Sequence, residues 1–280
     1  MPEDFAFAPD SLGQVRDLTA ASETRARELK DELIEAEARL KFWSALAEYL
    51  EKSWPIHMCA LVEADAEVLK RMRAQGSEAV PLLESIYRVA KEQSRRDMTA
   101  FAGEIERRAK EAGLQLNMET SRHPDYYFHG RYFKVHVDDR KLRARVSTSE
   151  GELGSAFPAD VGAVLERVAG EDQRVFGRKV GARSFMAALR KAYMAELKES
   201  NESVGWAAPV RRVMKRLQLA NRSFRRDEFL ADLGRLVGED RTAIDGYVMD
   251  LQQIKSPSEG ILLPGLEHRG YIGYIIFRKG

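Results

Sequence analysis

The sequence predicts a mainly α-helical chain with α+β parts, and three observations lead to this fold class. Apolar residues in the first third recur at alternating steps of four and three, which is typical of a helical hairpin or coiled coil. Alternating apolar and polar residues in the middle third indicate strands. The last third combines helical spacing with two short apolar runs around a glycine-containing loop. These patterns divide the chain into residues 1–113, 114–204 and 205–280.

Composition and charge suit small globular domains with different roles. The 280 residues are 44% hydrophobic and 32% charged, and the formal net charge is only +1. Residues 1–113 hold 17 Lys and Arg against 22 Asp and Glu, whereas residues 205–280 hold 13 against 9. This balance excludes a strongly basic protein that coats nucleic acid. The uneven distribution predicts that the acidic first third and the basic last third do different jobs.

The cysteine content and the absence of long apolar stretches bear on location. Cys59 is the only cysteine, which excludes an internal disulfide and is typical of a reducing compartment. No stretch approaches the roughly 20 apolar residues of a membrane span. The residues after Met1 do not resemble a signal peptide. We therefore expect a cytoplasmic protein that makes no membrane contact.

Residues 1–113 are predicted to form an acidic helical or coiled-coil region, beginning with a long helix over about 11–53. Its apolar positions form a heptad seam, made of Leu29, Leu33, Ala36, Leu40, Trp43, Ala47, Leu50 and Trp54. Pro55 ends this helix, and two more are expected over about 56–73 and 78–112. Two alternatives stay open: a bundle that packs on itself, or an interface for a protein partner or a second copy. The candidate partner-binding residues are Leu33, Leu40, Trp43 and Leu50.

Residues 114–204 are predicted to form a small α+β domain. A strand is expected over 114–118, followed by a hairpin of residues 126–137 and 141–148 with Asp139 and Arg140 as its loop. This register pairs Val137 with Leu142, Val135 with Ala144 and Phe133 with Val146 on one apolar face. The other face is basic and carries His136, Lys134, Arg143 and Arg145. Helices are expected over 160–168 and 184–199.

Residues 205–280 are predicted to contain helices and a final hairpin. Phe229, Leu230, Leu233 and Leu236 keep helical spacing, so residues 226–237 form a predicted helix, which Gly238 ends. A second helix is expected over 242–253. Two apolar runs follow, residues 261–263 and 271–277, and indicate a hairpin. From about Trp206 to Gly280 this order resembles the winged-helix superfamily, and the resemblance covers this third only.

The resemblance implies contact with double-stranded DNA. In winged-helix proteins the second helix of the motif usually enters the major groove and the wing touches phosphate or the minor groove. The expected groove helix is therefore residues 242–253. The candidate DNA-binding residues are Arg222, Arg225, Arg226, Arg241, Thr242, Lys255, His268 and Arg269.

Two function classes remain open, with an enzyme as the third. The first is a non-catalytic DNA-associated protein, either a transcription regulator or an accessory subunit of a DNA-processing or defence complex. The second is a structural adaptor in which every domain docks protein. The third is a metal-dependent nuclease, because Asp125, Asp139 and Lys141 outline a restriction-type pattern. A turn at Asp139 explains that residue equally well, and no cofactor or resident metal is predicted.

Overall fold

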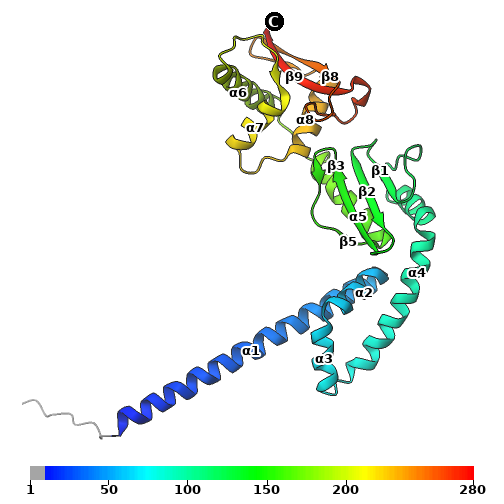
Figure 1. Ribbon diagram of the computed structural model, residues 1–280, viewed down its shortest axis with the longest axis vertical. Coiled ribbons are helices and arrows are strands. Elements are labelled where there is room, and N and C mark those ends of the chain that lie inside the picture. Colours follow the sequence, from blue (N-terminus) through cyan, green and yellow to red (C-terminus); the bar gives the residue numbers. More distant parts are fainter. Residues whose placement is uncertain (1–9) are drawn as a thin grey trace, which may run out of the picture. The chain divides into compact units, whose positions relative to one another are not determined.

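The computed structural model describes residues 10–280. These divide into two compact units, one that ends at Gln93 and one that spans Ser94–Gly280. The described chain is mainly helical, with long N-terminal helices, two small antiparallel sheets and a mixed α+β C-terminal part (Figure 1). The predicted fold class is confirmed at this level. The three-part domain division stays a prediction. Across residues 10–280, no helix has both the length and the apolar character that crossing a membrane requires.

The first unit contains α1 (Ser11–Glu51), α2 (Pro55–Ala64), α3 (Ala66–Ala74) and the first part of α4 (Ala79–Glu111). The predicted long helix is confirmed, and Pro55 begins α2 as its first helical residue. The single helix expected over 56–73 is interrupted at Asp65, whose backbone leaves helical geometry. The core of this unit joins the C-terminal end of α1 to the other helices, through Phe42, Leu46, Met58, Cys59, Val62, Leu69, Leu83 and Ala90.

The leucines of the heptad seam lie outside the core of this unit, whereas the seam residue Trp54 is buried and Trp43 packs, partly buried, against that core. Phe42 and Leu46 are each 2% exposed, whereas Leu29, Leu33, Leu40 and Leu50 are 45 to 69% exposed. Figure 1 shows the N-terminal part of α1 without a neighbour from α2 or α3. Solvent-exposed leucines in such numbers on one helix indicate a protein interface.

The second unit begins within α4 and builds its first sheet on the end of that helix. The strands are β1 (Asp125–Phe128), β2 (Phe133–Asp138), β3 (Arg143–Thr148), β4 (Gly151–Glu152) and β5 (Phe157–Pro158). They pair in the order β1-β2-β3-β4, with β5 on β3. Phe101 of α4 is buried, and its ring centroid lies 5.7 Å from that of Tyr126. The helix α5 (Val161–Val175) contacts β3 and is longer than predicted.

The predicted register of the β2–β3 hairpin was wrong by two residues. Val137 pairs with Ala144, not with Leu142, and the turn spans four residues because the Asp138 carboxylate accepts hydrogen bonds from the backbone N–H groups of Arg140 and Lys141. Side chains alternate along a strand with a period of two, so this shift keeps each residue on its predicted face. The apolar face is buried and the basic face is exposed, as predicted.

The strand expected over 114–118 was also wrong. Only one isolated bridge is present there, between Leu116 and Phe128.

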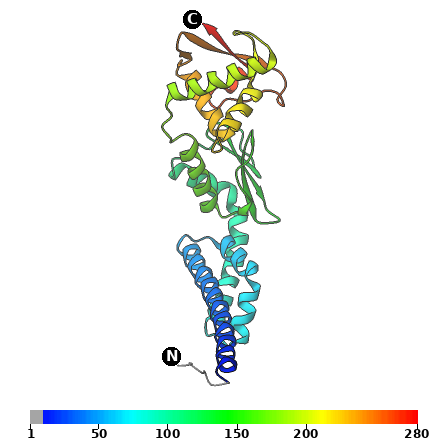
Figure 2. The ribbon, with the colours of Figure 1, turned by 90° about the vertical axis from the view of Figure 1, so that its left-hand side faces the viewer.

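The rest of the second unit combines three helices with a second sheet. Its elements are α6 (Ala182–Ser200), β6 (Ala208–Pro209), α7 (Val210–Ala220), α8 (Arg226–Gly238), β7 (Ala243–Ile244), β8 (Tyr247–Ile254), η1 (Glu267–Arg269) and β9 (Tyr271–Lys279). The strands pair in the order β6-β9-β8-β7. Both α6 and α7 contact β9 (Figure 2), and the rings of Tyr193 and Phe277 lie 5.2 Å apart. The helix predicted over 184–199 is thus confirmed with slightly wider bounds.

The helix predicted over Thr242–Gln253 was wrong, because these residues form β7 and most of β8. The two strands are joined by Asp245 and Gly246, which both have positive φ, of 47° and 74°. A two-residue hairpin turn requires this geometry and favours Asp-Gly. The strand predicted over 261–263 is reduced to one bridge between Ile261 and Ile272.

Alanine substitution of two glycines tests the hairpin. Gly246→Ala should lower the free energy of unfolding by about 1 kcal/mol, because a Cβ is strained at positive φ. Gly103→Ala should instead raise it by about 0.5–1 kcal/mol, because Gly103 lies exposed within α4 with open space around it. Urea denaturation measures both values. Stabilisation by Gly246→Ala would contradict the hairpin and restore the helix.

Candidate nucleic-acid interface

The helix α8 is surrounded by protein on most of its surface. Phe229, Leu230, Leu233 and Leu236 are buried, as their spacing predicted. Two acidic side chains of the same helix, Asp227 and Asp232, are also buried, at 7% and 4% exposure. Buried carboxylates require partners, since an unpaired charge in a protein interior is costly.

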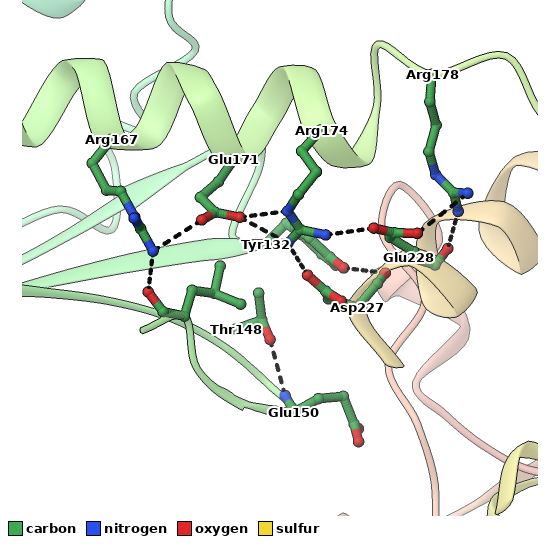
Figure 3. A network of polar contacts seen from close by, with 10 residues as sticks. Tyr132, Thr148, Glu150, Arg167, Glu171, Arg174, Arg178, Asp227 and Glu228 are labelled. Carbon is green, nitrogen blue, oxygen red and sulfur yellow. Dashed lines mark hydrogen bonds and ion pairs between the residues drawn. The ribbon is translucent and has the colours of Figure 1, made fainter. Parts of the chain in front are cut away.

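Arginines from α5 and the segment after it supply those partners (Figure 3). Arg174 is ion-paired with Asp227, and it lies 2.7 Å from Glu228 and 2.7 Å from Glu171. Arg178 pairs with Asp232 and donates a hydrogen bond to the backbone carbonyl of Glu228 at 3.1 Å. We call this the α5–α8 cluster; its members are Glu171, Arg174, Arg178, Asp227, Glu228 and Asp232. It fixes α8 against the middle of the chain along about one and a half helical turns.

Further contacts hold both ends of the same helix. Tyr132, from the turn before β2, donates its hydroxyl to the backbone carbonyl of Asp227. Arg235, near the C-terminal end, donates to the carbonyls of Phe176 and Arg178 at 2.9 and 3.1 Å. The ring of Phe176 stacks on His129 with centroids 3.7 Å apart. The loop between α5 and α6 is therefore clamped between the first sheet and α8.

Burial shifts the pKa of two groups around this cluster. Burial raises the pKa of Asp232 to about 6, although the nearby guanidinium of Arg178 acts in the opposite direction. Its Oδ1 atom has no hydrogen-bond partner within the described residues, which adds to the cost of the charged form. Burial also raises the pKa of Tyr132 well above its ordinary value. Tyr132 therefore stays a hydrogen-bond donor over the whole physiological pH range.

Three arginines at the start of α8 face solvent instead. Arg222, Arg225 and Arg226 are all exposed, and within residues 10–280 none of their guanidinium groups has an ion pair or a hydrogen bond. Asp227 and Glu228, the nearest acidic residues, already pair with Arg174. We call these three residues the arginine cluster.

The loop that carries the arginine cluster is anchored at two points. The ring of Phe224 lies 5.8 Å from that of Phe229, and the side chain of Asn221 accepts hydrogen bonds from the backbone N–H and the hydroxyl of Ser223. An ordered loop positions its exposed side chains with little loss of entropy on binding.

A cleft of about 530 Å³ borders Arg225 and Arg226, and its acidic lining is already neutralised. Glu150 pairs with Arg211 at 3.1 Å, and Glu152 pairs with Arg145 at 2.7 Å. Glu171 pairs with Arg167 as well as Arg174. The positive charge of Arg225 and Arg226 is therefore not compensated by this lining.

The connection between β8 and β9 carries the other candidate cations. Lys255, His268 and Arg269 are exposed there, the last two within η1. Arg211 donates to the carbonyl of Gly260 at 2.7 Å and so ties this connection to α7. The connection also packs closely on α8, because a Cβ added at Gly234 would lie only 2.9 Å from the Pro264 carbonyl oxygen. Gly234 follows Arg226 by eight residues, or about 12 Å along the helix axis.

Arg241 and Thr242 are placed differently from the prediction, and two arginines of α7 are engaged within the chain. Arg241 and Thr242 precede β7 and do not begin a helix, and Arg241 pairs with Glu239 at 3.2 Å. Arg212 and Arg216 of α7 both pair with the buried Glu196. Burial alone would raise the pKa of Glu196, but these guanidiniums outweigh that effect and lower it.

The residues of the nuclease pattern are engaged separately. The Asp125 carboxylate contacts His136 at 2.7 Å and Lys134 at 3.1 Å. Asp139 contacts His123 at 2.8 Å, and Lys141 lies 3.7 Å from Asp138. Within residues 10–280, no group of three or more His, Cys, Asp or Glu side chains could hold a metal ion. This arrangement gives the nuclease interpretation no support.

Sequence reasoning missed the whole α5–α8 cluster. One signal was present, since Asp232 lies three residues after Phe229 and four before Leu236, on the apolar face of the helix. A carboxylate in that position requires a buried cation. The identity of that cation depends on a contact between residues 54 positions apart, which no local pattern shows.

Comparison of the chain with protein-family models, curated proteins and solved structures gives no match.

Titration of Asp232 should make stability depend on pH. The ordinary pKa of 3.8 is raised to about 6 in the folded state, so between these values the folded protein holds a proton that the unfolded chain releases. The free energy of unfolding contributed by Asp232 is therefore highest below about pH 4 and falls as the pH rises through 6. Asp232→Asn removes this dependence. The stability of the wild type minus that of the variant should fall by on the order of 2 kcal/mol between pH 4 and pH 7.

Urea denaturation at several pH values measures this difference. Asp240→Asn is the matched control, because Asp240 is exposed and Asn also accepts its positive φ. A wild-type advantage that grows with pH would show that the ion pair with Arg178 outweighs burial and would overturn the assignment.

Proposed function

We propose that residues 182–280 form a winged-helix module that binds double-stranded DNA through its phosphates, in a non-catalytic DNA-associated protein. The order α6, β6, α7, α8, β8, β9 supports this module, because three helices precede a two-stranded hairpin. The module begins at α6, about 24 residues earlier than the resemblance in the sequence pattern implied. The groove helix of this proposal is α8 and no longer residues 242–253.

The arginine cluster is the observation that carries the proposal. Most arginines around it are used within the chain, including Arg174, Arg178, Arg211 and Arg216. Arg222, Arg225 and Arg226 are therefore an exception, because these three cations within five residues all face solvent. Guanidinium groups bind phosphate oxygens in a bidentate manner, and the free N–H groups at the start of α8 add to the attraction.

The α5–α8 cluster favours phosphate contact over base reading. A recognition helix reads bases by inserting its exposed side chains into the major groove. In α8 the central side chains are buried or paired with Arg174 and Arg178. Binding that uses phosphate alone carries no sequence information. An accessory subunit of a DNA-processing or defence complex fits this binding mode better than a sequence-specific regulator, and the exposed seam of α1 supplies a surface for assembly.

Replacing three arginines tests duplex binding. The variant Arg225→Ala, Arg226→Ala, Arg269→Ala should bind a random-sequence duplex more weakly than the wild type. Each lost phosphate contact lowers the slope of log K against log salt by about 0.9. Fluorescence anisotropy of a labelled duplex, titrated with the full chain between about 50 and 200 mM salt, measures both affinity and slope.

A second triple variant controls for the change in net charge. Arg27→Ala, Arg71→Ala, Arg88→Ala removes three exposed arginines from the first unit and should leave affinity and slope unchanged. Equal affinity and slope for wild type and the first variant would contradict DNA contact by the arginine cluster. A wild type that distinguishes strongly between duplexes of different sequence would contradict the phosphate-only mode.

The second candidate function is a structural adaptor in which every domain docks protein. The exposed leucines of α1 favour it, as does an apolar groove of about 830 Å³ between α6, α7 and α8, beside the 78% exposed Leu219. No salt-dependent affinity for random duplex at all would move the preference to this adaptor.

A further inference from the structure

The heptad pattern of α1 continues toward the N-terminus beyond the predicted seam. Counting back from Leu29 in steps of three and four gives Ala26, Ser22, Thr19, Val15 and Leu12. All five are exposed. The Thr19 hydroxyl donates to the backbone carbonyl of Val15 at 2.8 Å, which satisfies its polar group and leaves its methyl for packing. The extended seam therefore runs along nearly all of α1.

Intrachain packing leaves the leucine and alanine positions of this face open where α1 meets its own unit, although Trp43 is partly buried against the core. Phe42 and Leu46 face the core, whereas Leu40, Ala47 and Leu50 on the seam remain exposed. The two faces are adjacent, and Trp43 lies where they meet.

We propose that α1 pairs with α1 of a second copy of this chain as an antiparallel coiled coil, with the two-fold axis between Ile34 and Glu35. This inference develops the assembly role proposed above for the seam but does not depend on DNA binding. The register follows from two features of the sequence that lie on α1 itself: the sizes of the seam residues and the charges that flank them.

The sizes of the seam residues are complementary in this register. Trp43 lies opposite Ala26 of the second copy, Leu33 opposite Ala36, and Leu29 opposite Leu40. Large side chains thus meet small ones in the layers on either side of the leucine pair. Such alternation fills a helix–helix interface without voids or overlap.

The flanking charges are complementary as well. In an antiparallel coiled coil, a residue that directly follows a seam residue faces another such residue on the second helix. A residue that directly precedes a seam residue faces another that precedes one. This register brings Lys30 beside Glu37 of the second copy, Glu32 beside Arg39, and Arg16 beside Glu51. Each pair occurs twice because the interface is two-fold symmetric.

Other arrangements place like charges together. In a parallel pair Lys30 would lie beside Arg25 and Glu37 beside Glu32 of the second copy. Moving the antiparallel two-fold axis by half a heptad, to Asp31, would bring Lys30 beside Lys30 and Glu32 beside Glu32. Like charges at these positions disfavour both arrangements.

Charge reversal at positions 30 and 37 tests both orientation and register. Lys30→Glu alone, and Glu37→Lys alone, should each weaken self-association of the full chain by about tenfold, since each variant places two like-charged pairs in the interface. The double variant Lys30→Glu, Glu37→Lys should restore wild-type affinity. Sedimentation equilibrium over a range of concentrations measures the dissociation constant.

Each alternative gives a distinct result. A wild type that stays monomeric, or single variants that associate as well as the wild type, would overturn the proposal. Single variants that associate more tightly would indicate the parallel arrangement, because each then gains opposite charges, and would overturn the antiparallel one. Single variants that weaken association without rescue by the double variant would overturn the register.

Thiol cross-linking provides an independent readout. Ser22 lies opposite Ala47 of the second copy in this register, so a mixture of Ser22→Cys chains and Ala47→Cys chains should form a disulfide-linked dimer on oxidation. Neither variant alone should cross-link, since each would place its thiols on the order of 35 Å apart at 1.5 Å per residue. The wild type, whose Cys59 is buried, is the control. Cross-linking of Ser22→Cys alone would overturn the antiparallel arrangement.

Discussion

The second unit depends on the ion pairs that Arg174 and Arg178 make with α8. Asp227, Glu228 and Asp232 lie on a helix whose other central residues are apolar, so without these two arginines the helix would bury uncompensated charge. Removing one partner of such a pair typically costs 3–5 kcal/mol, far more than an exposed ion pair contributes. The same contacts hold the loop between α5 and α6 and connect the first sheet to the second. The arrangement of both sheets therefore follows from one group of buried charges.

These internal ion pairs also determine which arginines remain available to bind other molecules. Acidic residues near the arginine cluster are already paired with arginines from α5, α7 and β3. Arg225 and Arg226 lie beside these residues in sequence or space, yet their charge is not cancelled. The internal ion pairs and the exposed cations are thus two results of one distribution of charge. Counting Arg and Asp along the sequence cannot separate them, because the partners lie far apart in the chain.

The sequence predicted local elements well and long-range contacts poorly. The start of α1 and the bounds of α4 and α8 agree with the prediction within one residue, since apolar spacing, Gly113 and Gly238 mark the helices directly. The faces of the β2–β3 hairpin were also correct because alternation survives a shift of two residues, whereas its register depended on the Asp138 turn. The segment 242–253 was assigned to a helix from Ile244, Tyr247, Val248 and Leu251. The Asp245-Gly246 turn, which also lies in the sequence, was the stronger signal.

The solitary N-terminal part of α1 has a consequence for its own folding. The side chains of residues 12–34 are all exposed, and an isolated helix is only marginally stable in water. Its backbone hydrogen bonds should open readily in a single chain and be protected once another helix covers the seam. Order in this segment then varies with protein concentration, while the rest of the first unit keeps its core at any dilution. Amide hydrogen exchange along α1 would thus report the fraction of chains that are paired.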